Sequence, residues 1–82
     1  MVRLHPHAKE RLLERGATGE EVVLTVEHGE VFNAKYGRAG FRRNFPFDGL
    51  WRGNRYVFKQ TEAYAVKEDE DWLVITIVTR FF

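Results

Sequence analysis

Residues 18–36 read TGEEVVLTVEHGEVFNAKY, and within them the spacing of apolar residues changes from helical to extended. Thr18, followed three residues later by Glu21, is a capping-box pattern, which predicts the start of a helix. Valines then recur at helical spacing, and Gly29 is a natural helix end. From Glu30 onward the pattern becomes that of a strand. The chain therefore divides into a helical first part and an extended second part.

Another helix is predicted before this stretch. Pro6 suits its first turn, where a missing N–H has no consequence, and Gly16 suits the position after its last turn. Between them, Ala8, Leu12 and Leu13 fall on one broad face of a helix. We expect that face to pack inward.

The second part of the chain predicts about four strands. They are Glu30–Tyr36, Phe41–Phe47, Tyr56–Val66 and Trp72–Arg80. Pro46 indicates an edge or a strand end, and the broken alternation near Gln60–Glu62 indicates a bulge. The last strand is apolar on both faces, with Leu73, Ile75 and Ile77 on one and Trp72, Val74 and Val78 on the other. It belongs in the middle of the sheet or at a dimer interface.

Helices followed by strands indicate the α+β class. We expect a single domain over residues 1–82, with two N-terminal helices packed on a meandering antiparallel sheet of about four strands.

The composition removes several kinds of chemistry. The 82 residues include no Cys and no Ser, which excludes disulfides, thiolates and a serine nucleophile. Any reaction must therefore use His, Arg, Lys, Glu or Asp. The longest apolar stretch, Trp72–Val78, is too short to span a bilayer. We expect no membrane association and a cytoplasmic location.

Positive charge is concentrated in the middle of the chain, although the formal net charge is only +1. Residues 35–59 carry seven Lys or Arg and one Asp, which gives +6, and the segments on either side are net acidic. Phosphates or an acidic protein surface are the expected partners of such a segment. A solvated hairpin is the simpler alternative.

His7, Arg11 and Arg15 are spaced four residues apart, so they form one polar ridge beside the apolar face of their helix. Such a ridge faces the rim where helix meets sheet. A proton carrier beside a cation that binds phosphate oxygens is what metal-free phosphodiester cleavage needs. A purely structural role stays open, because His7 can bond to backbone and Arg11 can pair with Glu14.

No metal site and no cofactor are expected. His5 and His7 diverge by about 200° on a helix and cannot share an ion there, and no nearby carboxylate completes a ligand pattern. The acidic run Glu68–Asp71 lacks the spacing and glycine of a calcium loop, which favours a solvated turn.

Aromatic and basic residues alternate closely between residues 41 and 56. The members are Phe41, Arg42, Arg43, Asn44, Phe45, Trp51, Arg52, Arg55 and Tyr56. Single-stranded RNA is bound by such combinations, with cations along the phosphates and rings under the bases. The same residue types are enriched at protein interfaces, and strict alternation also fits a core with solvated arginines.

The pattern His7-Ala8-x-x-Arg11-x-x-x-Arg15-Gly16, followed by Glu20-Glu21-Val22, resembles the domain of unknown function 4258 family. The segment 74–79 is similar to that family's closing strand. The family is placed near the barnase/colicin/RelE-like ribonuclease toxins, small α+β proteins with helices on an antiparallel sheet. The resemblance implies that His7 and Arg11 are active-site candidates, with Thr79 or Arg80 contributing from the last strand.

The leading hypothesis is a toxin-like domain that cleaves or binds RNA without a metal, with His7 as general acid or base and Arg11 as phosphate stabiliser. The expected RNA contacts are Arg42, Arg43, Arg52, Arg55 and Lys59. An antitoxin-like protein is a further expected partner. The alternative is a non-catalytic protein-interaction module, or a homodimer assembled through the aromatic sheet edge or the last strand.

Overall fold

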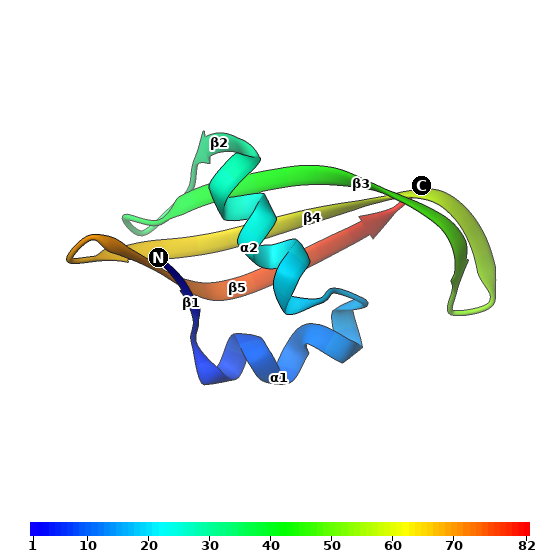
Figure 1. The fold of residues 1–82 in the computed structure, drawn as a ribbon, viewed down its shortest axis with the longest axis horizontal. Helices are drawn as coiled ribbons and strands as arrows, with labels where there is room; N and C mark the ends of the chain where they lie inside the picture. The colour runs from blue at the N-terminus through cyan, green and yellow to red at the C-terminus, as the bar shows by residue number, and fades with distance from the viewer.

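The helical and extended parts are both present in the computed structural model, which describes all 82 residues (Figure 1). The elements are β1 (Val2–Leu4), α1 (Pro6–Arg15), α2 (Gly19–His28), β2 (Glu30–Asn33), β3 (Ala39–Trp51), β4 (Asn54–Glu68) and β5 (Asp71–Phe81). One sheet holds five strands in the order β1-β5-β4-β3-β2. Helix α2 lies across β3 and β4, and α1 lies along β5. The predicted α+β class is confirmed.

Both helices have the ends that the sequence predicts. The Thr18 side chain accepts a hydrogen bond from the Glu21 N–H, and the Glu21 carboxylate accepts one from the Thr18 N–H, which completes the capping box of α2. Gly16 ends α1 in the left-handed region, at φ 70°. Local capping chemistry therefore fixes the short connection between the two helices.

The prediction that Leu13 lies on the inward face of α1 is wrong. Ala8 is buried and Leu12 packs against the core, but Leu13 is 91% exposed. At 3.6 residues per turn, Leu13 lies about 140° around the helix from Ala8 and points away from the sheet.

The sequence did not predict β1, so the expected four-stranded antiparallel sheet is corrected to a five-stranded mixed one. β1 pairs in parallel with β5, with Val2 opposite Trp72 and Leu4 opposite Val74. Three residues are too few to show an alternating pattern, and their partners lie at the far end of the chain. Beyond Val74, β5 has β4 on one side and no strand on the other.

The four predicted strands are present with different bounds. β2 stops at Asn33 instead of Tyr36, and the other three extend beyond their predicted ends. Pro46 lies within β3 where β2 no longer pairs with it, so the expected edge position is confirmed. A register shift follows between Pro46 and Gly49.

The predicted bulge in β4 is displaced from Gln60–Glu62. The pairing of β4 with β5 shifts between Tyr64 and Ala65, which are opposite Thr76 and Val74, respectively. Ile75 is the extra residue, so strict alternation along β5 fails. Val74 and Ile77 therefore both enter the core, although simple alternation places them on opposite faces.

The core lies between α2, α1 and one face of the sheet. Its buried members are Ala8, Ala17, Val22, Val26, Phe41, Ala63, Ala65, Val74 and Ile77. Two alanines on β4 let the helices approach the sheet closely. Phe41 and Trp72 meet edge to face beside them, with ring centroids 5.1 Å apart.

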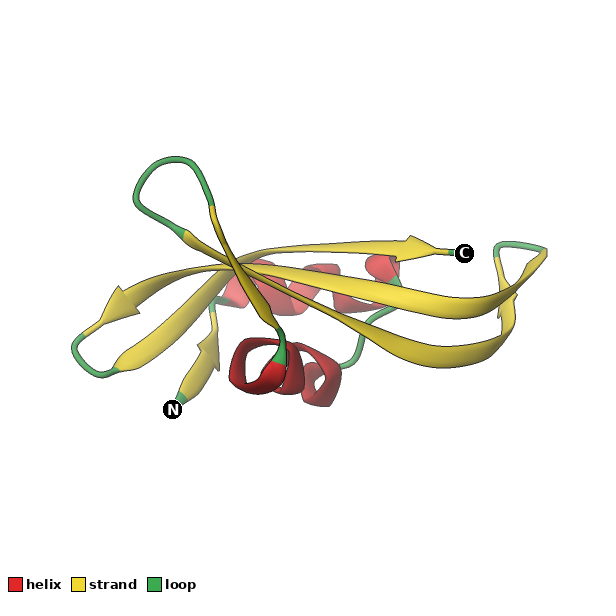
Figure 2. Cartoon of the chain, turned by 90° about the horizontal axis from the view of Figure 1, so that it is seen from above, coloured by secondary structure: helices red, strands yellow, loops and turns green.

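The opposite face of the sheet, which we call the open face, carries no helix. Figure 2 shows the loop between β2 and β3 projecting on this side, away from α2. Neither helix is long and apolar enough to cross a membrane.

Candidate functional site

The ridge on α1 lines a groove beside the free edge of β5, which we call the edge groove. Its lining residues are His7, Ala8, Arg11, Arg15, Ile75, Thr76 and Ile77, and its volume is about 200 Å³. The groove exists because β1 stops pairing with β5 at Val74 while α1 continues alongside. The four-residue spacing therefore places three polar side chains against one strand edge.

The polar side chains that line the edge groove make few hydrogen bonds or ion pairs within the protein. The His7 N–H donates to Nδ1 of His5 at 3.1 Å, so the histidine that caps the helix is His5 and not His7. Arg11 forms an exposed ion pair with Glu14 at 3.7 Å, and the Arg15 guanidinium has no ion pair. Exposed pairs of this length contribute little, so both arginines are able to bind an anion.

The C-terminal end of α1 is tied to two other segments. The Thr79 hydroxyl donates to the Arg15 carbonyl. Nη2 of Arg52, at the end of the hairpin between β3 and β4, donates to the Glu14 carbonyl at 3.0 Å. These bonds satisfy carbonyls that the helix itself leaves without partners, and they hold α1 in place along β5.

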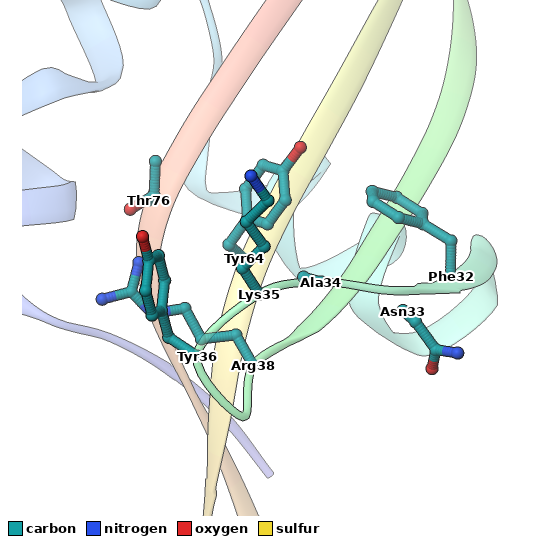
Figure 3. Close-up of a pocket in the computed structure, with 8 residues that line it drawn as sticks. All are labelled: Phe32, Asn33, Ala34, Lys35, Tyr36, Arg38, Tyr64 and Thr76. Atoms are coloured by element: carbon teal, nitrogen blue, oxygen red, sulfur yellow. The ribbon is translucent and has the colours of Figure 1, made fainter.

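A larger hollow, the open-face pocket, lies on the other side of the sheet. It measures about 620 Å³ and is lined by Phe32, Asn33, Ala34, Lys35, Tyr36, Arg38, Tyr64 and Thr76. Strand register places Phe32, Tyr64 and Thr76 in one row across the sheet. Figure 3 shows Tyr36 and Arg38 reaching from the loop toward Thr76.

Thr76 lines both the edge groove and the open-face pocket. The two hollows therefore adjoin at this point on the free edge of β5. His7 and Arg11 approach the edge from α1, and Tyr36 and Arg38 approach it from the loop between β2 and β3. Together they form the candidate site.

Glu62 is the centre of a charged network on the open face. Nη1 of Arg80 lies 2.5 Å from its Oε2, and the Tyr64 hydroxyl donates to its Oε1 at 3.0 Å. The hydrogen bond from Arg80 lowers the pKa of Glu62, and outweighs the opposing effect of burial. Burial, and then the bond to Glu62, raise the pKa of Tyr64. Glu62 is thus a fixed anion and Tyr64 a fixed donor.

The five basic residues expected to contact RNA lie outside both hollows of the candidate site, and four of them are exposed or half-buried. Arg42 pairs with Glu30 at 2.6 Å, and Arg55 pairs with Asp48 at 2.6 Å. Arg43 and Arg42 share a small hollow of about 300 Å³ on β3, and Arg52 lies at the hairpin end near α1. The structure does not bring these four together.

Lys59, the fifth, is buried on the helix side of β4. Its ammonium donates to the Gly16 carbonyl at 2.9 Å and to Oε1 of Glu21 at 2.7 Å. Two of its three N–H groups are therefore used inside the fold.

Sequence reasoning did not single out Tyr36, Tyr64 and Thr76, and it counted Lys35 and Arg38 only as part of the basic segment. The available signal was the Tyr36-Gly37 turn between two cations. Tyr64 and Thr76 carried no signal in the sequence, because only the strand register places them close to this loop.

Comparison with family models, with curated proteins and with solved structures finds no match. No group of three His, Cys, Asp or Glu side chains is arranged to hold a metal ion.

Proposed function

We propose that this protein is a toxin-like, metal-independent ribonuclease that acts at the edge groove. The supporting observation is that His7, Arg11 and Arg15 line one groove along the free edge of β5. A histidine without a helix-capping bond, beside two guanidinium groups, combines a proton carrier with stabilisers of phosphate charge. The resemblance to ribonuclease toxins, based on the same residues, agrees with this assignment.

The proposed reaction uses the 2′-hydroxyl of RNA as nucleophile. Neutral His7 accepts the proton of this hydroxyl as its oxygen bonds to phosphorus, and the bond from phosphorus to the 5′ oxygen breaks. The leaving oxygen takes a proton from solvent, and the imidazolium returns its proton to solvent. Arg11 stabilises the negative charge that accumulates on the phosphoryl oxygens in the transition state. The products are a 2′,3′-cyclic phosphate and a 5′-hydroxyl.

We also propose a cellular location and two partners for this enzyme. It acts in the cytoplasm on RNA, and an antitoxin-like protein would inhibit it by covering the edge groove. Basic side chains outside the groove, Arg42, Arg43, Arg52 and Arg55 among them, would attract RNA over a longer range. The +6 charge of residues 35–59 supports this part of the proposal.

The test is cleavage of single-stranded RNA by the purified protein, with a chelator present. His7→Ala should lower the rate at least about 100-fold, which is the usual contribution of a general acid or base. Arg11→Gln should also lower it, because phosphate stabilisation is lost. Lys9→Ala, a charge removed from the same helix outside the groove, is the matched control and should leave the rate unchanged. A His7→Ala variant with full activity would refute the catalytic assignment, and so would a wild type that cleaves no RNA.

A homodimer is the second candidate. Phe58 and Phe82 leave two neighbouring rings at the end of the sheet, 44% and 54% exposed, with centroids 5.7 Å apart. Exposed aromatic pairs of this kind are common in interfaces. Analytical ultracentrifugation of the wild type and of Phe82→Asp tests it. A dimer that becomes a monomer in the variant supports the assembly, and a monomeric wild type rejects it.

A further inference from the structure

We infer that the open-face pocket binds one unstacked base of an RNA strand whose backbone continues into the edge groove, so that the substrate class is single-stranded RNA. This inference rests on the proposed function and assigns a second, non-catalytic part of the same site. Its volume of about 620 Å³ lies within the usual range for pockets that bind small molecules or their equivalents.

The pocket offers aromatic surface to a base. Tyr36 is 87% exposed, and Phe32 and Tyr64 meet edge to face with centroids 5.8 Å apart. The Phe32 ring lies directly over Gly40, where an added Cβ would be only 2.4 Å from it. A side chain at that position would displace the ring, so Gly40 lets Phe32 lie flat against the strand. Stacking on such rings accepts any base, because every base has an aromatic face.

The backbone of Tyr36 is held in a conformation that side chains disfavour. Tyr36 and Gly37 both have positive φ, 63° and 71°, and the Arg38 N–H donates to the Lys35 carbonyl at 3.3 Å across this turn. A large aromatic residue in the left-handed region is uncommon, and here its ring gains almost no burial in return. Stability alone would favour Asn or Gly at this position. A stacking role for the ring explains both features.

The charge of the pocket suits phosphate. Lys35 and Arg38 line it, and neither takes part in an ion pair. The two carboxylates on neighbouring parts of the open face are already neutralised, Glu30 by Arg42 and Glu62 by Arg80. The pocket is therefore net positive, and phosphates beside a stacked base would meet two free cations.

The position of Thr76 indicates the path of the RNA strand across the protein. Because this residue lines both hollows, a chain with one base in the open-face pocket passes over the edge of β5 and enters the groove that holds His7 and Arg11. A duplex cannot follow this path, since its bases are paired and stacked on one another. The geometry thus selects single strands.

The experiment measures binding without cleavage. A fluorescein-labelled, fully 2′-O-methylated oligonucleotide of about ten nucleotides is titrated with the protein and followed by fluorescence anisotropy. Its methylated 2′-oxygens cannot act as nucleophiles. Tyr36→Ala should weaken binding about five- to 150-fold, the usual loss of one stacking ring, and Tyr36→Trp should restore it. Leu50→Ala, which removes an exposed apolar side chain outside both hollows, should bind like the wild type. A duplex of the same length should bind more weakly than the single strand.

The outcomes separate this inference from the proposed catalysis. If Tyr36→Ala binds as tightly as the wild type, or if the duplex binds more tightly than the single strand, the inference fails even when RNA is cleaved. If Tyr36→Ala weakens binding and Tyr36→Trp restores it while the wild type cleaves no RNA, the inference stands and the ribonuclease proposal fails. A wild type that binds no oligonucleotide overturns the inference.

Discussion

Nζ of Lys59 lies 2.7 Å from Oε1 of Glu21, and only 7% of the lysine side chain is exposed. The same carboxylate oxygen accepts the Thr18 N–H of the capping box. The start of α2 is thereby fastened to the middle of β4. A residue expected from the sequence to contact RNA is part of the joint between helices and sheet.

Lys59→Met should therefore act on folding. It leaves the Glu21 carboxylate without its buried cation, and breaking a pair of this kind costs about 3 kcal/mol of the free energy of unfolding. Urea denaturation measures the loss. The double variant Lys59→Met with Glu21→Gln should be less destabilised than the single one, because the uncompensated charge is gone. Equal stability of Lys59→Met and wild type would show that the pair contributes nothing.

Gly16 and Gly53 form a matched pair for substitution. Both have positive φ, 70° and 86°, but a Cβ at Gly16 would lie 2.7 Å from the Trp51 ring, whereas one at Gly53 would meet nothing within 4 Å. Gly53→Ala should lower the free energy of unfolding by about 1 kcal/mol for the backbone alone. Gly16→Ala should lower it by about 1–3 kcal/mol more, because Trp51 must move. Similar losses in thermal denaturation would contradict the proposed contact.

The network at Glu62 predicts acid sensitivity. Its pKa is lowered in the folded protein, so its contribution to stability is complete above the ordinary value of 4.5 and is lost as the pH falls through the lowered value. Urea unfolding as a function of pH should show this loss in the wild type. Glu62→Gln should show a smaller change across the same range. The exposed Glu27→Gln serves as the control and should keep the wild-type dependence.

The salt dependence of RNA binding should identify which arginines contact phosphate. Arg38→Gln should reduce the slope of log affinity against log salt by about 0.7, the value for one phosphate contact on a single strand. Lys9→Gln should leave the slope nearly unchanged, because Lys9 lies on α1 outside both hollows. An unchanged slope in Arg38→Gln would place the phosphates elsewhere.

Local chemistry allowed much of this fold to be predicted. The capping box at Thr18 and the glycine at position 16 marked both helices correctly, because these signals act within a few residues. β1 escaped prediction since its only partner is β5, about seventy residues away along the chain. The bulge at Ile75 escaped for a related reason. It depends on the pairing of two strands and leaves no mark in either one alone.

In the candidate site, too, local spacing was predictable from the sequence and long-range placement was not. Helical spacing was enough to put His7 and Arg11 on one ridge, and the structure places that ridge beside a strand edge; their chemistry stays a prediction. The contribution of Tyr64 and Thr76 depends on strand register, and that of Tyr36 on a loop folding across the open face. Periodicity does not report such long-range placements.

The parallel pairing of β1 with β5 also determines when the edge groove can form during synthesis. The edge groove needs residues 7–15 and residues 75–77 together, and β1 has no other strand to pair with. During synthesis, α1 leaves the ribosome well before β5, and it has no β5 to pack against until residues 75–77 have followed. Contacts so distant in sequence make folding slow, and they leave the nascent chain without a groove. Until residues 75–77 have been made, the nascent chain therefore has neither a paired β1 nor an edge groove.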